Sequence, residues 1–282
     1  MPNFFECGRF RFDVRSAHSK PLVMGVLNVT PDSFSDGGRY QSIDLAISHA
    51  EQMIADGVDI IDIGGESSRP GAAPLALDEE LARVMPLIYA LRDCGKAISI
   101  DTYKPEVMRE AIIAGVDMVN DIRGFGDPAS RSVVAGSDVA VCVMHMQNKP
   151  ENMQQQPSYV DVVREVQAFL SGRCEDLLAA GVERSRICVD PGFGFGKTLE
   201  HNLHLLRHLG ALGEHLQLPV LAGISRKNMI GVLTGKPVEK RMAGSVAAAL
   251  AAVQQGAKLV RVHDVAETVD AIKVWQAIQS GI

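Results

Sequence analysis

The stretch LVMGVLNVTPDSFSDGG, residues 22–38, begins as a short apolar strand candidate and runs into a polar loop. The same change from apolar to polar recurs about eight times, with segments of helical length in between. This repeated order of strand, polar end and helix predicts an α/β protein with a (β/α)8 barrel, whose active site gathers at the carboxyl ends of the strands. The expected strands end at Asn28, Asp62, Asp101, Asn120–Asp121, His145, Asp190, Ser225–Lys227 and Arg261–His263.

The alternative architecture is an open doubly wound sheet, which places its main ligand loop after the first strand. Polar strand ends spread over the whole chain favour the closed barrel. Ahead of the barrel, FFECGRFRFD (4–13) has the pattern of two short strands around a turn, and we expect residues 1–19 to form a hairpin that caps the barrel bottom. Since no linker interrupts the composition, residues 1–282 are expected to form a single domain.

Amphipathic stretches between the strands predict the helices of the barrel. They cover residues 43–57, a segment beginning near residue 78, and residues 104–115, 159–180, 200–210, 242–255 and 265–279. Gly57 is a suitable end for the first of them. Glu79 and Glu80 fall in the first turn of the second, where negative charge is favourable against the helix dipole.

The composition indicates a soluble globular protein, with 46% hydrophobic and 22% charged residues. A formal net charge of −6 argues against a general nucleic-acid or membrane-surface binder. We find no apolar run of about 18 residues and no secretory signal in MPNFFECGRFRFDV, so no membrane span is expected. The five cysteines contain no CxxC pair, which predicts reduced thiols in a cytoplasmic protein.

The glycine-rich segment DPGFGFGKT, residues 190–198, is not a phosphate-binding P-loop, because Pro191 stands where that motif requires Gly. Its glycines allow the backbone to approach a flat ligand closely. Phe195 is expected either to stack on that ligand or to pack on the barrel rim. His145 is expected to be structural, with Met144 beside it offering apolar contact to a ring.

Three polar residues at strand ends, Asp101, Asn120 and Asp190, should converge on the centre of a closed barrel. Carboxylates accept hydrogen bonds and an amide both donates and accepts, so together they suit a planar heterocycle with an amino group beside a ring N–H. The alternative for Asp101 alone is a cap on the helix that opens at Lys104-Pro105.

Cationic side chains gather at other strand ends, namely Arg69, Arg226, Lys227, Arg261 and His263. Arginine binds phosphate bidentately, and barrels often hold phosphate after strands seven and eight. Asn28 ends the first strand, beside the eighth in a closed barrel, so Asn28, Arg261 and His263 form a candidate diphosphate corner. The Asn28 oxygen is also a candidate ligand for Mg²⁺, which takes few protein ligands and keeps several waters.

Seven segments, in order and at suitable spacing, resemble the bacterial dihydropteroate synthase family from about residue 20 to the end of the chain. They are MGVLNVTPDSFSDGG (24–38), GGESSRPGA (64–72), SIDTYKPEV (99–107), VNDIRG (119–124), DPGFGFGK (190–197), GISRK (223–227) and RVHDVAET (261–268). The resemblance implies a transferase that joins 6-hydroxymethyl-7,8-dihydropterin diphosphate to p-aminobenzoate, releasing 7,8-dihydropteroate and diphosphate in folate synthesis. It also implies a TIM barrel, Mg²⁺, inhibition by sulfonamides that mimic p-aminobenzoate, and a homodimer formed through the last helices.

The resemblance assigns the candidate site residues. Pterin-binding residues are Asp101, Asn120, Met144, Asp190, Phe195, Gly223 and Lys227. Diphosphate-binding residues are Asn28, Arg69, Arg261 and His263, with Asn28 as the metal ligand. Residues for p-aminobenzoate are Phe34, Ser68, Arg69, Pro70, Lys227 and Asn228. The catalytic set is Asp101, Asp190, Lys227, Arg261 and His263, with Asp36 and Asp62 as further candidates.

Two positions depart from the family pattern: relatives commonly carry Thr at Ser68 and Ser at Asn228. Neither change removes hydrogen-bonding capacity, so activity is still expected. A dissociative reaction fits these residues, because an electron-rich dihydropterin can stabilise a methylene cation once diphosphate leaves. The alternatives are a methyltetrahydrofolate-type methyltransferase barrel, against which the two polar loops speak, and a catalytically idle paralogue that binds pterins.

Overall fold

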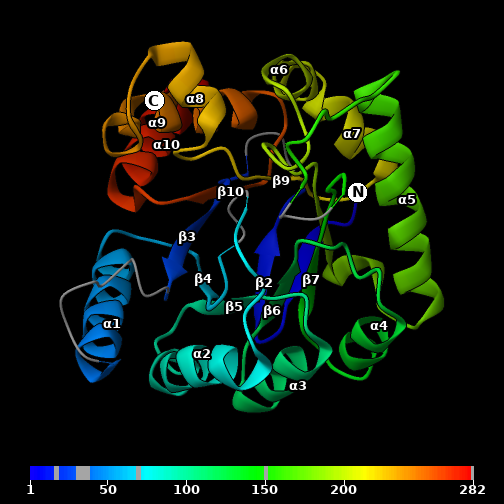
Figure 1. Cartoon of the computed structure of the whole chain (residues 1–282). Helices are drawn as coiled ribbons and strands as arrows, with labels where there is room; N and C mark the ends of the chain where they lie inside the picture. The colour runs from blue at the N-terminus through cyan, green and yellow to red at the C-terminus, as the bar shows by residue number, and fades with distance from the viewer. Residues whose placement is uncertain (16–18, 30–38, 68–70, 149–151, 281–282) are drawn as a thin grey trace.

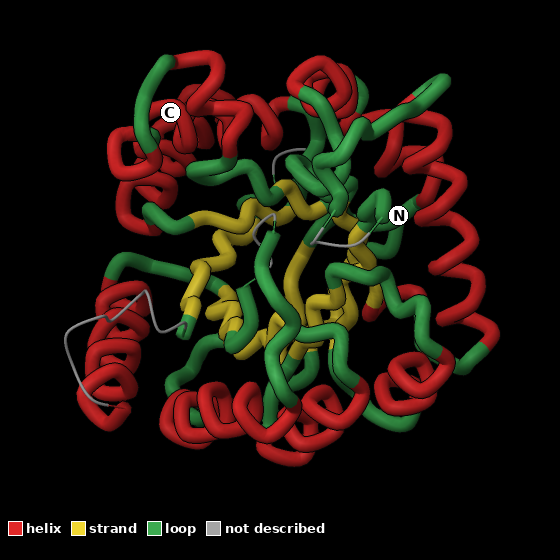
Figure 2. The backbone as a smooth tube through the Cα atoms, in the orientation of Figure 1, coloured by secondary structure: helices red, strands yellow, loops and turns green. Residues whose placement is uncertain are grey.

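The computed structural model describes residues 1–15, 19–29, 39–67, 71–148 and 152–280. Eight parallel strands lie in the order β8-β7-β6-β5-β4-β3-β10-β9, and Figure 2 shows them around a central axis with the helices outside. A parallel bridge between Val189 and Val220 joins the two ends of this order. The closed barrel is confirmed, and the open doubly wound sheet is excluded. The strand bounds are β3 (Leu22–Asn28), β4 (Ile60–Gly64), β5 (Ala97–Asp101), β6 (Met118–Asp121), β7 (Ala140–Met144), β8 (Ile187–Asp190), β9 (Leu221–Ala222) and β10 (Leu259–Val262).

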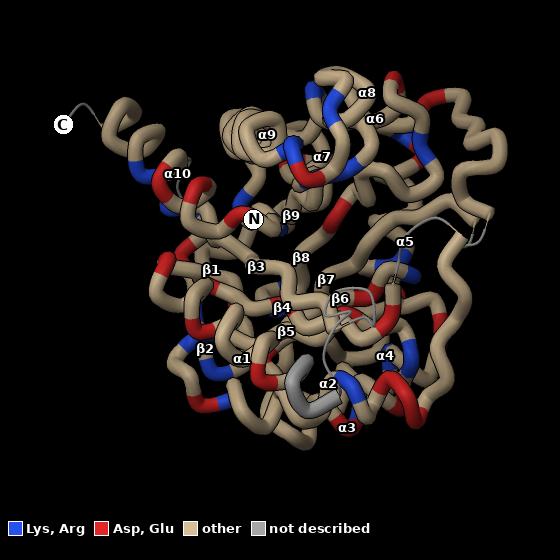
Figure 3. The backbone as a smooth tube through the Cα atoms, turned by 60° about the vertical axis from the view of Figure 1, so that its left-hand side comes forward, with Lys and Arg blue, Asp and Glu red and all other residues tan. Residues whose placement is uncertain are grey.

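Helices alternate with these strands and surround the barrel (Figure 1). Their bounds are α1 (Arg39–Ala55), α2 (Leu77–Leu91), α3 (Pro105–Ala114), α4 (Pro128–Ala135), α5 (Val162–Ala179), α6 (Leu199–Arg207), α7 (Leu209–Leu216), α8 (Asn228–Thr234), α9 (Met242–Gln254) and α10 (Val265–Ser280), with short 3-10 turns at Arg184–Arg186 and Val238–Lys240. Within the described residues, no helix is both long and apolar enough to cross a membrane. Basic and acidic positions are interspersed along the backbone (Figure 3).

Local sequence signals explain several helix ends. Asp161 caps α5 by accepting hydrogen bonds from the backbone N–H groups of Val163 and Arg164. Helix α3 begins at Pro105, whose missing N–H is not needed in the first turn, and ends at Gly115 with φ of 103°. These ends fix where each strand can begin, and so where its polar end emerges.

The structure differs from the sequence prediction in three places. The helix expected at 200–210 is two helices, because the chain turns at His208 between α6 and α7. The seventh strand is shorter than expected, since β9 stops at Ala222 and residues 223–227 form a loop that leads into the short helix α8. Helix α4 was not predicted, although Asp127 followed by Pro128 is a recognisable helix start in which the Asp127 side chain accepts from Ala129 N–H.

The core has two parts, and the second one supports the site from below. The larger part lies between the outer faces of the strands and the helices. The smaller part fills the lower barrel interior, where Met24, Ile60 and Cys188 meet Phe5 and Cys7. The last two come from a hairpin, β1 (Phe4–Cys7) and β2 (Phe10–Asp13), so the expected N-terminal hairpin is confirmed.

An ion pair fastens this hairpin to the barrel. Arg9 donates from Nε to Oδ1 of Asp117 at 2.8 Å and from Nη2 to Oδ2 at 2.8 Å. The same buried carboxylate accepts the backbone N–H of Ile98 at 3.0 Å. The lower end of the barrel is filled and fastened in this way, which leaves the carboxyl ends of the strands for a site.

Candidate active site

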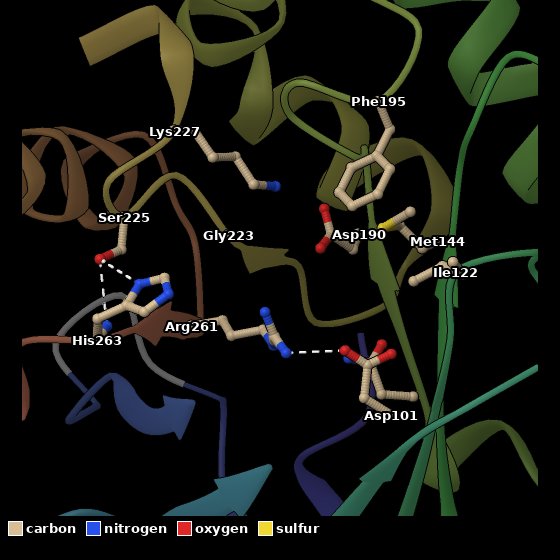
Figure 4. Close-up of a pocket in the computed structure, with 11 residues that line it drawn as sticks. Asp101, Ile122, Met144, Asp190, Phe195, Gly223, Ser225, Lys227, Arg261 and His263 are labelled. Carbon is tan, nitrogen blue, oxygen red and sulfur yellow. Dashed lines mark hydrogen bonds and ion pairs between the residues drawn. The ribbon is translucent and has the colours of Figure 1, made fainter. Parts of the chain in front are cut away.

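A pocket opens among the carboxyl ends of the strands, and Figure 4 shows side chains from many parts of the chain pointing into it. The residues that line it are Asp101, Asn120, Ile122, Met144, Asp190, Phe195, Gly223, Ser225, Lys227, Arg261 and His263. They come from the ends of β5, β6, β7, β8 and β10 and from the loops that follow β8 and β9. The pocket therefore exists only because the sheet closes on itself.

Every residue that the sequence assigned to the pterin lies on this lining. Ile122 and Ser225 line it too, although the sequence analysis gave neither a role. Ile122 stands two residues after Asn120, and Ser225 two residues after Gly223. Both follow the end of a strand and lie within two residues of an assigned position, and that closeness in sequence was the available signal.

Other predicted site residues lie elsewhere or outside the described residues. Asn28 ends β3 and is not on the pocket lining; the strand register runs from Asn28 across Gly64 to Asp101. A side chain at Gly64 would stand 3.0 Å from Asn28 Oδ1, so glycine keeps that edge open. Asn228 is exposed at the first residue of α8. The predictions for Phe34, Asp36, Ser68, Arg69 and Pro70 fall outside the described residues.

Arg261 joins two carboxylates at the bottom of the pocket. Its Nε donates to Oδ2 of Asp62 at 2.6 Å, and its Nη2 donates to Oδ2 of Asp101 at 2.8 Å. Asn120 donates to the same Asp62 oxygen at 3.3 Å. Asp62 is fully buried, and its Oδ1 has no hydrogen-bond partner among the described residues. Removing the guanidinium would leave an uncompensated buried charge, so this network holds the pocket floor.

The same burial shifts the proton affinities of the pocket carboxyls. Burial raises the pKa of Asp101 to about 7, opposed by Arg261 and assisted by Asp62. Burial also raises the pKa of Asp190, opposed chiefly by Lys227. Lys227 responds in the opposite sense, since burial lowers its pKa to about 8 in spite of Asp190. Several ionisable groups in one cleft whose pKa values are shifted in favour of the neutral form are typical of a functional site.

Lys227, Asp190 and Phe195 face one another across the upper pocket (Figure 4). Lys227 Nζ lies 4.5 Å from the centre of the Phe195 ring and donates to the carbonyl oxygen of Phe193 at 2.5 Å. Gly223 leaves the space between them free, because an added Cβ there would lie 3.6 Å from Asp190 Oδ2 and 3.8 Å from Lys227 Nζ. A flat ring can therefore be bounded by an apolar face and a pair of opposite charges.

His263 lies at the opposite rim, against Ser225. The Ser225 hydroxyl oxygen lies 3.1 Å from His263 Nδ1 and accepts the His263 backbone N–H at 3.2 Å. Burial, with the nearby charges of Arg261 and Arg226, lowers the pKa of His263 to about 4, so the imidazole is neutral near pH 7. Arg226 itself pairs with Asp264 instead of the pocket, its Nε donating to Oδ2 at 3.1 Å, and is not part of the lining.

A second charged cluster lies where β4 and β5 end. Lys104 forms ion pairs with Glu66 and with the buried Glu80, whose Oε1 has no hydrogen-bond partner among the described residues. Glu66 also accepts from the hydroxyl of Tyr103 at 2.9 Å and from the backbone N–H of Leu75 at 3.2 Å. Burial alone would lower the pKa of Lys104, but its hydrogen bonds to the two glutamates outweigh burial and raise it. This cluster ties residues 66 and 75 to the end of β5.

The pocket presents hydrogen-bond acceptors, cations and an apolar face within one cleft, which suits a planar nitrogen heterocycle carrying an anionic group. Comparison with known proteins agrees. Residues 24–263 match the family model described as pterin binding enzyme. The chain belongs to this family, a class of pterin-binding barrels.

Its relatives include bacterial dihydropteroate synthases. The sequence is 48% identical over 278 residues to the dihydropteroate synthase of Neisseria meningitidis serogroup C, covering 97% of each chain. Its fold matches the Burkholderia cenocepacia enzyme complexed with 7,8-dihydropteroate, with a TM-score of 0.89, 49% identity and coverage of 99% and 98%. It also matches the Xanthomonas albilineans enzyme with 4-aminobenzoic acid, with a TM-score of 0.91, 47% identity and 99% of each chain, and the Yersinia pestis enzyme with a sulfonamide drug, with a TM-score of 0.91, 44% identity and coverage of 99% and 100%. The family expected from the sequence is confirmed.

Substitution of Lys104 tests the second cluster. Lys104→Met would leave Glu80 buried without its counter-ion, and we expect the free energy of unfolding to fall by about 3–5 kcal/mol. Denaturant unfolding at pH 7 measures this. Lys273→Met, at an exposed ion pair with Asp270, is the matched control and should change stability by less than about 1 kcal/mol. Equal stability of the two variants would show that the cluster does not hold this edge of the barrel.

Proposed function

We propose that this protein is a dihydropteroate synthase, which condenses 6-hydroxymethyl-7,8-dihydropterin diphosphate with p-aminobenzoate to form 7,8-dihydropteroate and diphosphate. The observation that carries the proposal is the convergence of Asp101, Asn120, Asp190 and Lys227 on one pocket. Similarity to dihydropteroate synthases over nearly the whole chain supports it and does not favour a methyltransferase or an idle paralogue.

The pterin ring would lie between the charged floor and the apolar wall. Its ring N–H and amino group are donors, and Asp101 and Asp190 supply carboxylate acceptors while Asn120 supplies both a donor and an acceptor. The apolar contacts would come from Phe195 and Met144, which belong to one buried cluster. Lys227 can donate to a ring oxygen or nitrogen once it leaves the carbonyl of Phe193.

The diphosphate would lie toward Arg261, His263 and Asn28, with Arg69 as a further donor. Arg261 is fixed by two bonds that do not use Nη1, so that amino group is suited to a phosphate oxygen. Neutral His263 can donate a hydrogen bond to the same group. Both would then stabilise charge that develops on the leaving diphosphate.

Mg²⁺ fits these residues as a substrate-borne ion. The described residues contain no group of three or more His, Cys, Asp or Glu side chains able to hold a metal by themselves. An ion that keeps several waters and binds substrate phosphates needs few protein ligands, and the amide oxygen of Asn28 is the one we assign. When bound, Mg²⁺ would neutralise charge on the diphosphate.

The pocket residues favour a reaction in which diphosphate departs before the amine of p-aminobenzoate forms the new C–N bond. Ionised Asp101 and Asp190 stabilise positive charge on the dihydropterin after diphosphate departs. The aromatic amine of p-aminobenzoate is neutral and nucleophilic at pH 7, so no strong base is required, which fits a pocket whose histidine is hydrogen-bonded to serine. The amine then attacks the exocyclic methylene carbon and releases a proton to solvent.

p-Aminobenzoate would bind beyond the pterin, near Lys227 and Asn228 and the segments carrying Phe34, Ser68, Arg69 and Pro70. The exposed amide of Asn228 can donate to the carboxylate. Sulfonamides, seen on the Yersinia pestis relative, would compete there because they present a similar aromatic amine.

All five cysteines are free, which supports a cytoplasmic enzyme.

Conversion of Asp190 to Asn tests the assignment. It removes the carboxylate charge while keeping shape, and we expect kcat/KM for the pterin substrate to fall at least about 100-fold. The measurement follows dihydropteroate and diphosphate together, with and without EDTA to assess Mg²⁺. Asp270→Asn, on the exposed face of α10, serves as control. Turnover close to wild type in the folded Asp190→Asn protein would remove Asp190 from the mechanism, and no product from the wild type would overturn the proposed function.

The expected pH dependence of kcat/KM follows from two groups whose pKa values are shifted, Asp101 and Lys227. Asp101 is protonated below its pKa of about 7 and accepts hydrogen bonds as a carboxylate above it. Lys227 is cationic below its pKa of about 8 and neutral above it. We therefore expect kcat/KM for the pterin substrate to rise with pH, peak between these values and fall, with limbs that belong to the interacting site as a whole. Asp101→Asn should abolish the acidic limb; retention of that limb would assign it to another group.

A homodimer would use the last helices. Large apolar side chains are exposed on and next to α8, α9 and α10, namely Val232, Leu233, Val238, Met242, Val274 and Ile278. Such exposure favours a partner surface over solvent. Light scattering should give twice the chain mass for the wild type, and Ile278→Asp should shift it toward the monomer. A monomeric wild type at micromolar concentration would contradict this.

A further inference from the structure

The loop between β8 and α6 is held by side chains along its whole length. Each carbonyl from Gly192 to Gly196 accepts a hydrogen bond from a side chain. The donors are Lys197 to Gly192 and Phe195, Lys227 to Phe193, Gln154 to Gly194 and Tyr159 to Gly196. Short loops usually leave carbonyls to water, so a fully bonded loop has one imposed conformation.

Lys197 makes two of these bonds from a buried position. Its amino group donates to the carbonyl oxygens of Gly192 at 2.9 Å and Phe195 at 3.0 Å, and the residue is 3% exposed. No described carboxylate lies within ion-pair distance of it. Burying an ammonium without a paired carboxylate is costly, so the residue needs more than a packing reason.

His145 is the third hydrogen-bond partner of the Lys197 side chain. Lys197 Nζ lies 2.9 Å from His145 Nδ1, and the imidazole packs edge-on against Phe169 at 4.9 Å between ring centres. Burial and then the charge of Lys197 lower the pKa of His145 to about 3, so the ring is neutral and Nδ1 is free to accept. The loop also approaches His145 directly: Gly192 has φ of 70°, and a Cβ there would lie 1.9 Å from the His145 carbonyl oxygen.

Both ends of this loop reach the pocket. Gly192 N–H donates to Asp190 Oδ1 at 2.7 Å, which fixes the carboxylate, and Phe195 forms part of the pocket wall. Lys197 bonds the carbonyls of these two residues, Gly192 and Phe195. Its ammonium therefore links the orientation of the acidic group to the placement of the aromatic ring.

We propose that Lys197 is a positioning residue for the pterin half of the site. It holds the Gly192–Gly196 loop so that Phe195 and Asp190 face the ring. This inference rests on the proposed function for the identity of the ring. It assigns to Lys197 and His145 a role in ligand binding that neither plays by contact, since neither lines the pocket.

The charge of Lys197 acts on Asp190 together with its neighbours. The titratable or charged groups around this region include Asp190, Lys227, His145 and Arg261, and Tyr159, which packs near His145 and donates to the carbonyl of Gly196. Burial lowers the pKa of Lys197 to about 7, opposed by Asp190 and assisted by Lys227. Removing the Lys197 charge would raise the pKa of Asp190, because Lys197 is among the groups that lower it.

Two substitutions, Lys197→Met and Lys197→Arg, test whether the hydrogen-bonding amino group at this position is needed for pterin binding. We expect Lys197→Met to raise the KM for dihydropterin diphosphate about tenfold or more, the scale of one lost charged hydrogen bond, and the KM for p-aminobenzoate by less than about threefold. Lys197→Arg keeps charge and donors and should lose less pterin affinity. Lys236→Met, an exposed lysine near the end of α8, is the matched control.

Calorimetric binding of 6-hydroxymethylpterin to the same variants separates this inference from the proposed reaction, because it requires no turnover. Weaker binding to folded Lys197→Met supports the inference even if the wild type forms no dihydropteroate. Unchanged pterin binding, or equal rises in both KM values, would overturn it. Should Lys197→Met fail to fold, His145→Phe removes the acceptor and keeps the aromatic packing; a pterin affinity equal to wild type in that variant would also overturn the inference.

Discussion

The ion-pair network of Arg261 with Asp62 and Asp101 is the interaction on which the site depends. It joins strands that are distant in the sequence, and it lies at the centre of the barrel where water is scarce. In such surroundings two carboxylates repel each other, and the guanidinium between them offsets part of that repulsion by pairing with both. Burial raises the pKa of Asp101 and the guanidinium opposes that rise, while the two carboxylates fix the orientation of Arg261.

Around that network the pocket is organised by charge on one side and by backbone hydrogen bonding on the other. The loop that follows β8 would have several unpaired carbonyls in an open structure, but lysine, glutamine and tyrosine side chains satisfy them. Rigid placement of a binding loop reduces the entropy that a ligand must remove on binding. A site built in this way can recognise a flat heterocycle with few direct contacts, because the contacts are already oriented.

Features that depend on neighbouring residues could be predicted from the sequence, whereas contacts between residues distant in the chain could not. Polar residues at strand ends were recognisable one by one, and the barrel fold then implied that Asp101, Asn120 and Asp190 converge. The sequence did not reveal that Arg261 turns inward to two carboxylates, because its partners lie on other strands. Nor did it reveal the part played by Lys197, because its burial and its contact with His145 arise only in the folded barrel.

The sequence by itself determined the fold class, the family and most pocket residues, because strand periodicity, helix ends and ordered motifs are local properties of the chain. Only the tertiary structure decided which charges pair, which carbonyls are satisfied and how far each pKa moves. Those quantities depend on burial and on distances between atoms from separate segments. For that reason Arg226, adjacent to Lys227 in sequence, pairs with Asp264 outside the pocket while Lys227 faces Asp190 within it.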